Sequence, residues 1–197
     1  MLSYTEICSL LGKDIYIYPF VKENLKGVGY NFSVGPFAWS LEKMKILESG
    51  KEDRNAFIVE PGDTALVWTN ETIYVSDSIG GTFHSKVTQA SMGFSAIATT
   101  LDPGWNGVLL IAITNMSKSQ KHLKKGESFV TLIFDRTKDS LPEARKDASR
   151  TGRVELLNKL GIILTPEASQ WIAEDYRYRE EYLINKVRTE NTYQGLK

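Results

Sequence analysis

The stretch TTLDPGWNGVLLIAIT, residues 99–114, decides how the rest of the chain is interpreted. It begins with an acidic turn, DPGWNG (residues 102–107), and continues into an apolar segment, VLLIAI (residues 108–113), that predicts a buried strand. Proline presets φ and glycine accepts positive φ, so the Pro-Gly pair favours a tight turn. Asp102 and Trp105, fixed on such a turn, can be aimed at a small ligand, although a plain loop between two core strands has the same pattern.

Composition limits the function classes. The chain has 197 residues and a formal net charge of +0, so nothing in it favours general nucleic-acid or membrane affinity. Cys8 is the single cysteine, which excludes an intrachain disulfide framework and a cysteine-based metal cluster. His84 and His122 are the only histidines, so a His-rich metal site or a His-centred triad is poorly supplied. The longest apolar run, residues 108–113, is too short to span a bilayer, and we see no apolar leader stretch. We therefore expect a cytoplasmic protein without nucleic-acid or membrane partners.

Short alternating segments separated by turn residues fill the first two thirds of the chain. Residues 3–6 form a capping box that predicts a short helix ending at Gly12. Strands are predicted at 15–18, 30–34, 56–59, 64–68, 72–75, 95–100, 108–114 and 128–134. Residues 35–36, Gly-Pro, are expected to end the second of these. The Gly-, Ser- and Thr-rich residues 79–94 predict a surface loop or the wall of a ligand site. This spacing of strands favours a barrel or a sandwich.

The sequence changes character after residue 135. Residues 137–150 are polar and charged and indicate a linker, and residues 153–160 predict a short helix. Thr165 and Pro166 form a typical helix start, with threonine as N-cap and proline at the first helical position. Apolar residues then recur at helical spacing, so a second helix is expected to run to about Arg188.

Four segments in order resemble the dCTP deaminase branch of the dUTPase-like superfamily. They are LSYTEICSLLGKDIYIYPF with GYNFSVG, VEPGDTALVWTNETIYVSDSIGG, LDPGWNGVLLIAITN, and LKKGESFVTLIF. The resemblance implies a mainly β, dUTPase-like distorted β-barrel (β-clip) over residues 1–137, followed by a linker and helical C-terminal extension over residues 138–197. It also implies a homotrimer that binds a nucleotide at its subunit interfaces, with Mg²⁺ on the nucleotide phosphates.

The resemblance carries over a set of nucleotide-binding positions. They are His84, Ser85, Lys86, Gln89, Ala98, Asp102 and Trp105. Ser85 matches a serine that helps to hold the substrate and the reacting water. His84 replaces an arginine that contacts phosphate, and Gln89 replaces a catalytic arginine. Lys86 can restore part of the lost charge, although as a point charge. Gln89 can also serve only to satisfy buried backbone groups.

The family's catalytic glutamate falls on Ala112, five residues after Gly107. Metal-free deamination needs a group that protonates the base and activates water, which a carboxylic acid can do and a methyl group cannot. We also expect no zinc, because the cysteine pair of the zinc-dependent cytidine deaminases is missing. The sequence therefore predicts a pseudoenzyme of nucleotide metabolism, impaired in deamination, that binds or sequesters a nucleotide.

Two alternatives stay open. In the dUTPase branch the aspartate of the turn is the general base, and Asp102 and Trp105 occupy the matching places, but two phosphate-contacting residues become His84 and Thr131. The first alternative is thus an active family enzyme, a dCTP deaminase or a dUTP pyrophosphatase using Asp102. The second is a structural trimer with a closed pocket.

The chain end NTYQG, residues 191–195, resembles a family tail that closes over the nucleotide.

Overall fold

The structure, a computed structural model, describes residues 1–50, 53–96, 99–137 and 151–196. Its strands are β1 (Ile15–Tyr18), β2 (Gly29–Ser40), β3 (Lys45–Ile46), β4 (Ala56–Val59), β5 (Thr64–Val75), β6 (Ile79–Ser85), β7 (Phe94–Ala96), β8 (Thr100–Leu101), β9 (Asn106–Asn115), β10 (Lys121–Lys124) and β11 (Ser128–Arg136). Its helices are α1 (Tyr4–Leu10), α2 (Val87–Ser91), α3 (Val154–Lys159), α4 (Pro166–Ile172), α5 (Asp175–Tyr178) and α6 (Glu180–Thr189), with short turns η1 (Lys22–Asn24) and η3 (Thr151–Arg153). No helix in these ranges is long and apolar enough to cross a membrane.

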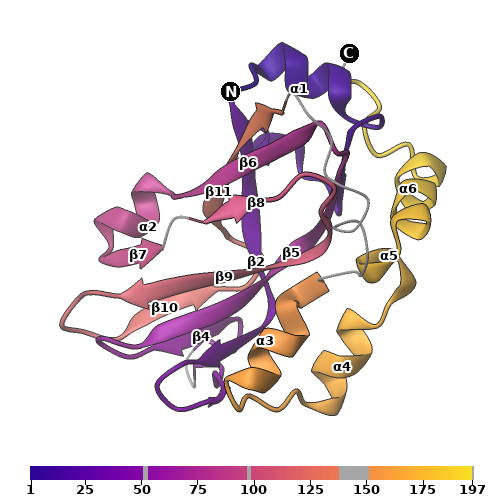
Figure 1. The fold of residues 1–197 in the computed structure, drawn as a ribbon. Helices are drawn as coiled ribbons and strands as arrows, with labels where there is room; N and C mark the ends of the chain where they lie inside the picture. Colours follow the sequence, from indigo (N-terminus) through magenta and orange to yellow (C-terminus); the bar gives the residue numbers. More distant parts are fainter. Residues whose placement is uncertain (51–52, 97–98, 138–150, 197) are drawn as a thin grey trace.

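One stretch of chain supplies both edges of the main sheet, so the sheet curls on itself (Figure 1). The strand order is β7-β9-β5-β2-β11-β6-β8, with β1 on β5 and β3 on β2, and β4 pairs with β10 separately. β7 and β8 stand at opposite ends of this order, yet only residues 97–99 separate them in the sequence. The predicted mainly β, barrel-like fold with C-terminal helices is confirmed.

Alternation along β9 divides the apolar side chains between the two faces of the sheet. Leu109, Ile111 and Ile113 belong to the main core inside the curl. Val108 and the partly buried Ala112 belong to the opposite face, where they meet the C-terminal helices. We call this second set the sheet–helix cluster; its buried members are Trp39, Leu66, Trp68, Val108, Leu157, Ile162, Ala168 and Ile172. The outer face of β5 and β9 is therefore covered by the chain's own C-terminal segment.

The predicted helix starts are confirmed. Ser3 Oγ accepts from the Glu6 backbone N–H at 3.4 Å, and Glu6 Oε2 accepts from the Ser3 N–H at 2.9 Å. Thr165 Oγ1 accepts from the Ala168 N–H at 3.2 Å, with proline at the start of α4. These local hydrogen bonds need no tertiary context, which is why the sequence reveals them.

The single helix expected to reach about Arg188 is wrong. The chain instead forms α4, α5 and α6, because Glu174 (φ −62°, ψ 129°) and Arg179 (φ −116°, ψ 118°) adopt extended backbone between them. The breaks turn Arg177 inward, where its guanidinium lies 3.6 Å from the ring centre of Trp171. Tertiary packing thus overrides a helical periodicity that contains no Pro or Gly.

Two strand predictions and one loop prediction are corrected. β2 does not stop at residues 35–36, because a register shift between Val34 and Ala38 accommodates them. The separate strands 64–68 and 72–75 are one strand, β5. Residues 79–94 are not a surface loop, because β6 pairs with β11 on one side and β8 on the other, followed by α2. Of the predicted linker, residues 138–150 lie outside the described part of the chain.

Candidate functional site

Four of the predicted nucleotide positions lie together at the end of β6 and in α2; we call them the β6–α2 group. His84 is exposed, and its Nε2 lies 3.0 Å from Thr82 Oγ1. Lys86 Nζ donates to Ser128 Oγ at 2.6 Å. Gln89 is only 5% exposed, and its Oε1 has no hydrogen-bond partner within the described ranges. Ser85, the fourth member, is the last residue of β6. Since buried acceptors are normally satisfied, Gln89 Oε1 is the group here that most needs a donor.

The second group lies on the turn of residues 102–107. Asp102 is exposed, whereas Trp105 is buried. The Trp105 indole Nε1 donates to the Gly107 carbonyl at 3.2 Å, and the guanidinium of Arg153 lies over its ring, 4.8 Å from the centre. The ring therefore packs within its own chain, and its stacking on a nucleoside stays a prediction.

The two groups are not adjacent within one chain. In the β6–β8 ladder Gly81 pairs with Leu101 and Thr82 with Thr100, which puts Asp102 level with Gly80. Ser85 is five residues beyond Gly80, a separation of roughly 16 Å at about 3.3 Å per strand residue. Ala98, the remaining predicted position, lies outside the described residues.

A polar row crosses three strands beside the β6–α2 group. Thr131 pairs with His84 on one side and with Asn31 on the other. Thr131 Oγ1 donates to Asn31 Oδ1 at 2.8 Å, and Asn31 is buried. Sequence reasoning missed Asn31, although its signal was present: Asn31 and Ser33 alternate with the apolar residues of β2 and share one face of the sheet.

Ala112 lies against the sheet–helix cluster. It pairs with Leu66 across the β5–β9 ladder. Beside it, the rings of Trp68 and Trp171 stack with their centres 5.7 Å apart, and Trp39 meets Trp68 edge-on at 4.6 Å. Position 112 therefore offers no acid or base, and its surroundings are apolar.

Glu71 is a buried carboxyl group that the sequence did not single out. It is fully buried, and Ser33 donates to it twice, from the backbone N–H to Oε2 at 2.8 Å and from Oγ to Oε1 at 2.6 Å. Burial raises the pKa of Glu71 to about 7, while the hydrogen bonds from Ser33 act in the opposite direction. Because the β2–β5 and β5–β9 ladders both shift register nearby, the carboxyl group bridges an irregular part of the sheet.

The C-terminal tail is bound to its own chain. The Tyr193 hydroxyl accepts from the Ile17 N–H at 2.6 Å and donates to the Ile17 carbonyl at 3.0 Å. The ring of Tyr193 meets Phe20 edge-on at 5.0 Å. These contacts place the NTYQG stretch against β1 and Phe20, where it does not cover either group of predicted site residues.

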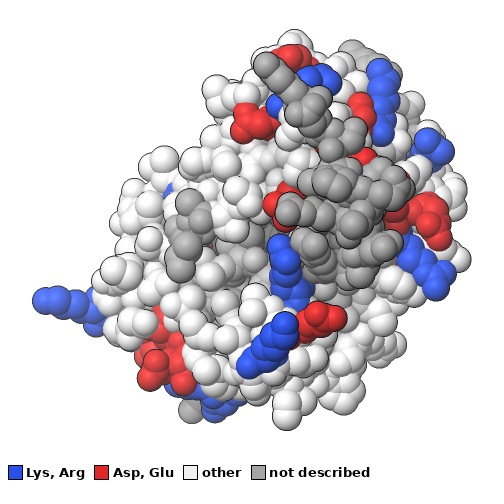
Figure 2. Space-filling model, in the orientation of Figure 1, with Lys and Arg blue, Asp and Glu red and all other residues white. Residues whose placement is uncertain are grey.

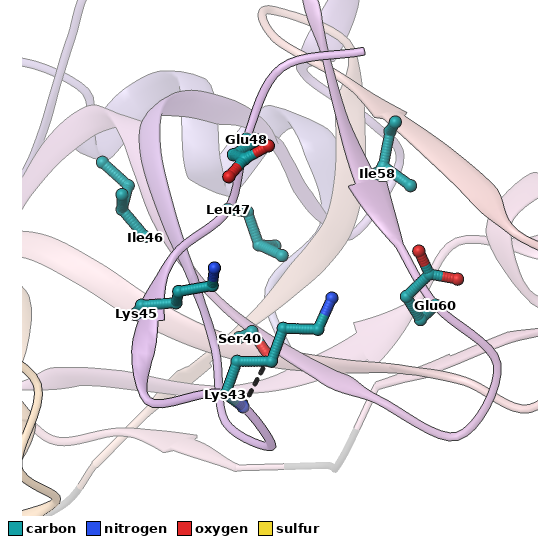
Figure 3. A pocket seen from close by; sticks show the side chains of 8 residues that line it. All are labelled: Ser40, Lys43, Lys45, Ile46, Leu47, Glu48, Ile58 and Glu60. Atoms are coloured by element: carbon teal, nitrogen blue, oxygen red, sulfur yellow. Dashed lines mark hydrogen bonds between the residues drawn. The ribbon is translucent and has the colours of Figure 1, made fainter.

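A cavity of about 130 Å³ lies apart from both groups, beside β3 and β4 (Figure 3). Lys43, Lys45, Glu48 and Glu60 surround it, and Glu60 Oε1 accepts from Gln120 Nε2 at 2.8 Å. None of the predicted site residues that the structure describes lines this cavity. Across the described ranges there is also no group of three or more His, Cys, Asp or Glu side chains that could hold a metal ion.

The surface around the β6–α2 group is almost free of charge. Residues 78–101 contain a single charged side chain, Lys86. Figure 2 shows the corresponding broad white area, on the side where β6, α2 and β7 lie in Figure 1, while charged side chains gather elsewhere. Val87, Met92 and Met116 expose 80%, 46% and 71% of their surface there. We call this area the uncharged face.

Comparisons with known proteins agree with this fold. The family model described as dCTP deaminase-like matches residues 1–137. The dCTP deaminase of Pyrococcus horikoshii is 32% identical over 127 residues, which cover 64% of this chain and 79% of the relative. The dCTP deaminase of Thermococcus kodakarensis is 36% identical over 124 residues, which cover 63% of this chain and 77% of the relative.

A solved structure shares the fold. The crystal structure of 2′-deoxycytidine 5′-triphosphate deaminase from Agrobacterium tumefaciens aligns with a TM-score of 0.56 at 12% identity, over 73% of this chain. The alignment spans half of that longer chain, so it bears on the fold alone. Because the family model matches more than half of this chain, the chain belongs to the dCTP deaminase-like family.

Proposed function

We propose that this protein is a nucleotide-binding member of the family that is impaired in deamination. The observation that carries the proposal is the packing of Ala112, where the resemblance places the catalytic glutamate, against the sheet–helix cluster. Gln89 in place of the catalytic arginine points the same way. Loss of general acid–base assistance alone typically lowers a rate by about 10²–10⁴-fold. We propose a cytoplasmic role in nucleotide metabolism, in which the protein binds or sequesters its ligand.

We propose that the nucleotide site forms between copies of the chain in a homotrimer. The separation of the β6–α2 group from Asp102 supports this, because a second copy can bring its turn next to the first copy's α2. The uncharged face supports it as well, since interface cores are depleted in charged side chains. In this arrangement Gln89 Oε1 receives its missing donor from the ligand or from the second copy.

Mg²⁺ in this site is proposed to be held by the nucleotide phosphates. This ion usually keeps several waters and binds substrate phosphates rather than an all-protein cage. The side chains fit that arrangement: Lys86 and His84 would face phosphate oxygens, while Asp102 would orient a ribose hydroxyl or a water. Ala98 completes the proposed set. With a single cysteine in the chain, we propose that zinc is not used.

A calorimetric titration with dCTP and dUTP, each with Mg²⁺, tests the proposal when product formation is followed in the same samples. We expect saturable binding with neither dUTP formed from dCTP nor pyrophosphate released. Steady turnover that disappears in Asp102→Ala would overturn the binding-only proposal.

One observation favours an alternative, hydrolysis of dUTP through Asp102. Its side chain is exposed on the turn, where it can reach solvent water, whereas position 112 is packed. Under this alternative dUTP would yield pyrophosphate and dCTP would remain unchanged, and Asp102→Asn would abolish the reaction because an amide cannot accept the proton of the water.

A further inference from the structure

The start of the C-terminal segment contacts the turn of residues 102–107 and the beginning of β9. Thr151 Oγ1 accepts from the Val108 N–H at 2.8 Å. The guanidinium of Arg153 lies over the ring of Trp105, as described above. Between them, the Gly152 carbonyl accepts from the indole Nε1 of Trp68 at 2.7 Å. We call Thr151, Gly152 and Arg153 the brace.

Two glycines make this approach possible. A Cβ on Gly107 (φ +132°) would lie 2.5 Å from the Cβ of Thr151, and a Cβ on Gly152 (φ +61°) would lie 2.7 Å from the ring of Trp68. Both positions also have the positive φ that side chains other than glycine rarely adopt. The brace therefore meets the turn at Gly107 and β5 at Trp68, each at a distance that leaves no room for a methyl group.

Thr151 accepts a backbone hydrogen bond of β9 that a neighbouring strand would otherwise accept. β7 pairs with β9 only at residues 113–115, and the Leu109 N–H already points to the other side, toward Thr69 Oγ1. The Val108 N–H thus meets Thr151 at a part of β9 that β7 does not reach. A second contact holds Asn106, a residue of the turn itself, because its Nδ2 donates to the Tyr178 carbonyl of α5 at 3.0 Å.

We propose that the brace positions the nucleotide turn, so that Thr151, Gly152 and Arg153 determine where Asp102 and Trp105 point. None of the three needs to touch the ligand; they act through the turn. The proposal rests on the proposed function, in which this turn is one half of the nucleotide site. It gives the helical extension a direct role in ligand binding.

Thr151→Val tests the hydrogen bond, because it removes the acceptor of the Val108 N–H and keeps the shape of the side chain. With dCTP and Mg²⁺ as the probe, we expect affinity to fall about 5-fold and the Val108 amide to exchange its hydrogen faster by a similar factor, as for one lost hydrogen bond. Thr151→Ser retains the hydroxyl and should restore both. Thr189→Val is the control, since Thr189 is exposed and bonds within α6, to the Asn185 carbonyl.

Gly152→Ala tests the close approach. Its matched control is Gly161→Ala, because Gly161 also has positive φ (+80°) but no atom of the described residues within 4 Å of its Cβ position. Both variants put a side chain at positive φ, so the difference between them reports chiefly the contact with Trp68. We expect only Gly152→Ala to shift the indole N–H resonance of Trp105 and to weaken dCTP binding.

The proposal is overturned if Thr151→Val and Gly152→Ala leave nucleotide affinity as in the unmodified protein, whether or not the Trp105 indole resonance shifts. Its failure is distinguishable from failure of the proposed function. If the unmodified protein binds neither dCTP nor dUTP, the proposed function fails, and the positioning role fails with it. If binding is present and insensitive to both variants, only the brace is wrong.

Discussion

At the scale of single residues, the carboxyl group of Glu71 determines part of the pH dependence of stability. Its pKa rises from 4.5 to about 7 on folding because the group is buried. The folded state therefore binds more protons than the unfolded state between these values, so stability falls as pH rises through this window. At about 1.4 kcal/mol per pKa unit, the expected loss is about 3 kcal/mol.

Glu71→Gln should remove that loss, since the amide is uncharged and can still bond to Ser33. Urea unfolding at pH 5 and pH 8 gives the loss of unfolding free energy between these pH values, which is then compared between the variant and the unmodified protein. Glu127→Gln is the control because Glu127 is exposed. An unchanged pH dependence in Glu71→Gln would show that the group is charged in the folded state at both pH values.

Ala112→Glu tests the replaced catalytic position at the same scale. We expect no dUTP from dCTP, because the new carboxylate would meet the sheet–helix cluster rather than a ligand. We also expect a loss of roughly 2–4 kcal/mol in unfolding free energy, from placing a charge in apolar surroundings. Ala173→Glu, at an exposed position, should change stability by less than about 0.5 kcal/mol. Deamination gained without loss of stability would contradict our account of position 112.

At the scale of elements, α5 contacts the sheet through Arg177, whose Nη1 donates to the Asn70 carbonyl of β5 at 3.5 Å. This side chain is 6% exposed and stacks on Trp171 and Tyr176, with distances of 3.6 and 4.6 Å to the ring centres. Its carboxylate neighbour, Glu174, lies 3.7 Å away and is itself half-exposed. The planar guanidinium therefore matters more here than the ion pair.

Arg177→Lys should destabilise the protein by about 1–2 kcal/mol, because a lysine keeps the charge and loses the stacking plane. Thermal unfolding followed by tryptophan fluorescence measures this effect. Arg179→Lys is the matched control, since Arg179 is exposed and lies 5.2 and 5.4 Å from the ring centres of Tyr178 and Tyr182. Equal stability changes in the two variants would contradict a special role for Arg177.

Local signals made some elements predictable and left others hidden. The capping box at Ser3 and the cap at Thr165 follow from residues three apart, and β9 follows from its apolar run. The breaks around α5 depend on the packing of Arg177 on Trp171, which the helical spacing of the apolar residues does not reveal. The separation of Asp102 from the β6–α2 group depends on the β6–β8 register in the same way. The resemblance could therefore name site residues without showing which of them share a chain.

At the scale of the whole molecule, a curled sheet carries its own C-terminal segment on one face and leaves the uncharged face exposed. We retain as a proposal the division into a β domain of residues 1–137 and an extension of residues 138–197. In the proposed homotrimer the uncharged face is buried between copies, and the extension stays outside. The extension would then brace the nucleotide turn without taking part in assembly.

Val87→Glu tests that assembly. We expect the unmodified protein to sediment with three times the mass of the chain, and Val87→Glu to sediment as smaller species, because the glutamate would be buried without a partner. Ile163→Glu is the matched control, since Ile163 is 87% exposed and Val87 80%, and Ile163 lies between α3 and α4. Dissociation by Ile163→Glu alone would place the interface on the helical extension.

The most direct test of nucleotide binding without deamination is to recover the bound ligand. The protein is equilibrated with dCTP and Mg²⁺ for hours, separated from free nucleotide, and denatured, and the released nucleotide is identified by chromatography. Our account predicts unchanged dCTP in stoichiometric amount. Recovery of dUTP or dUMP, or of no nucleotide at all, would contradict it.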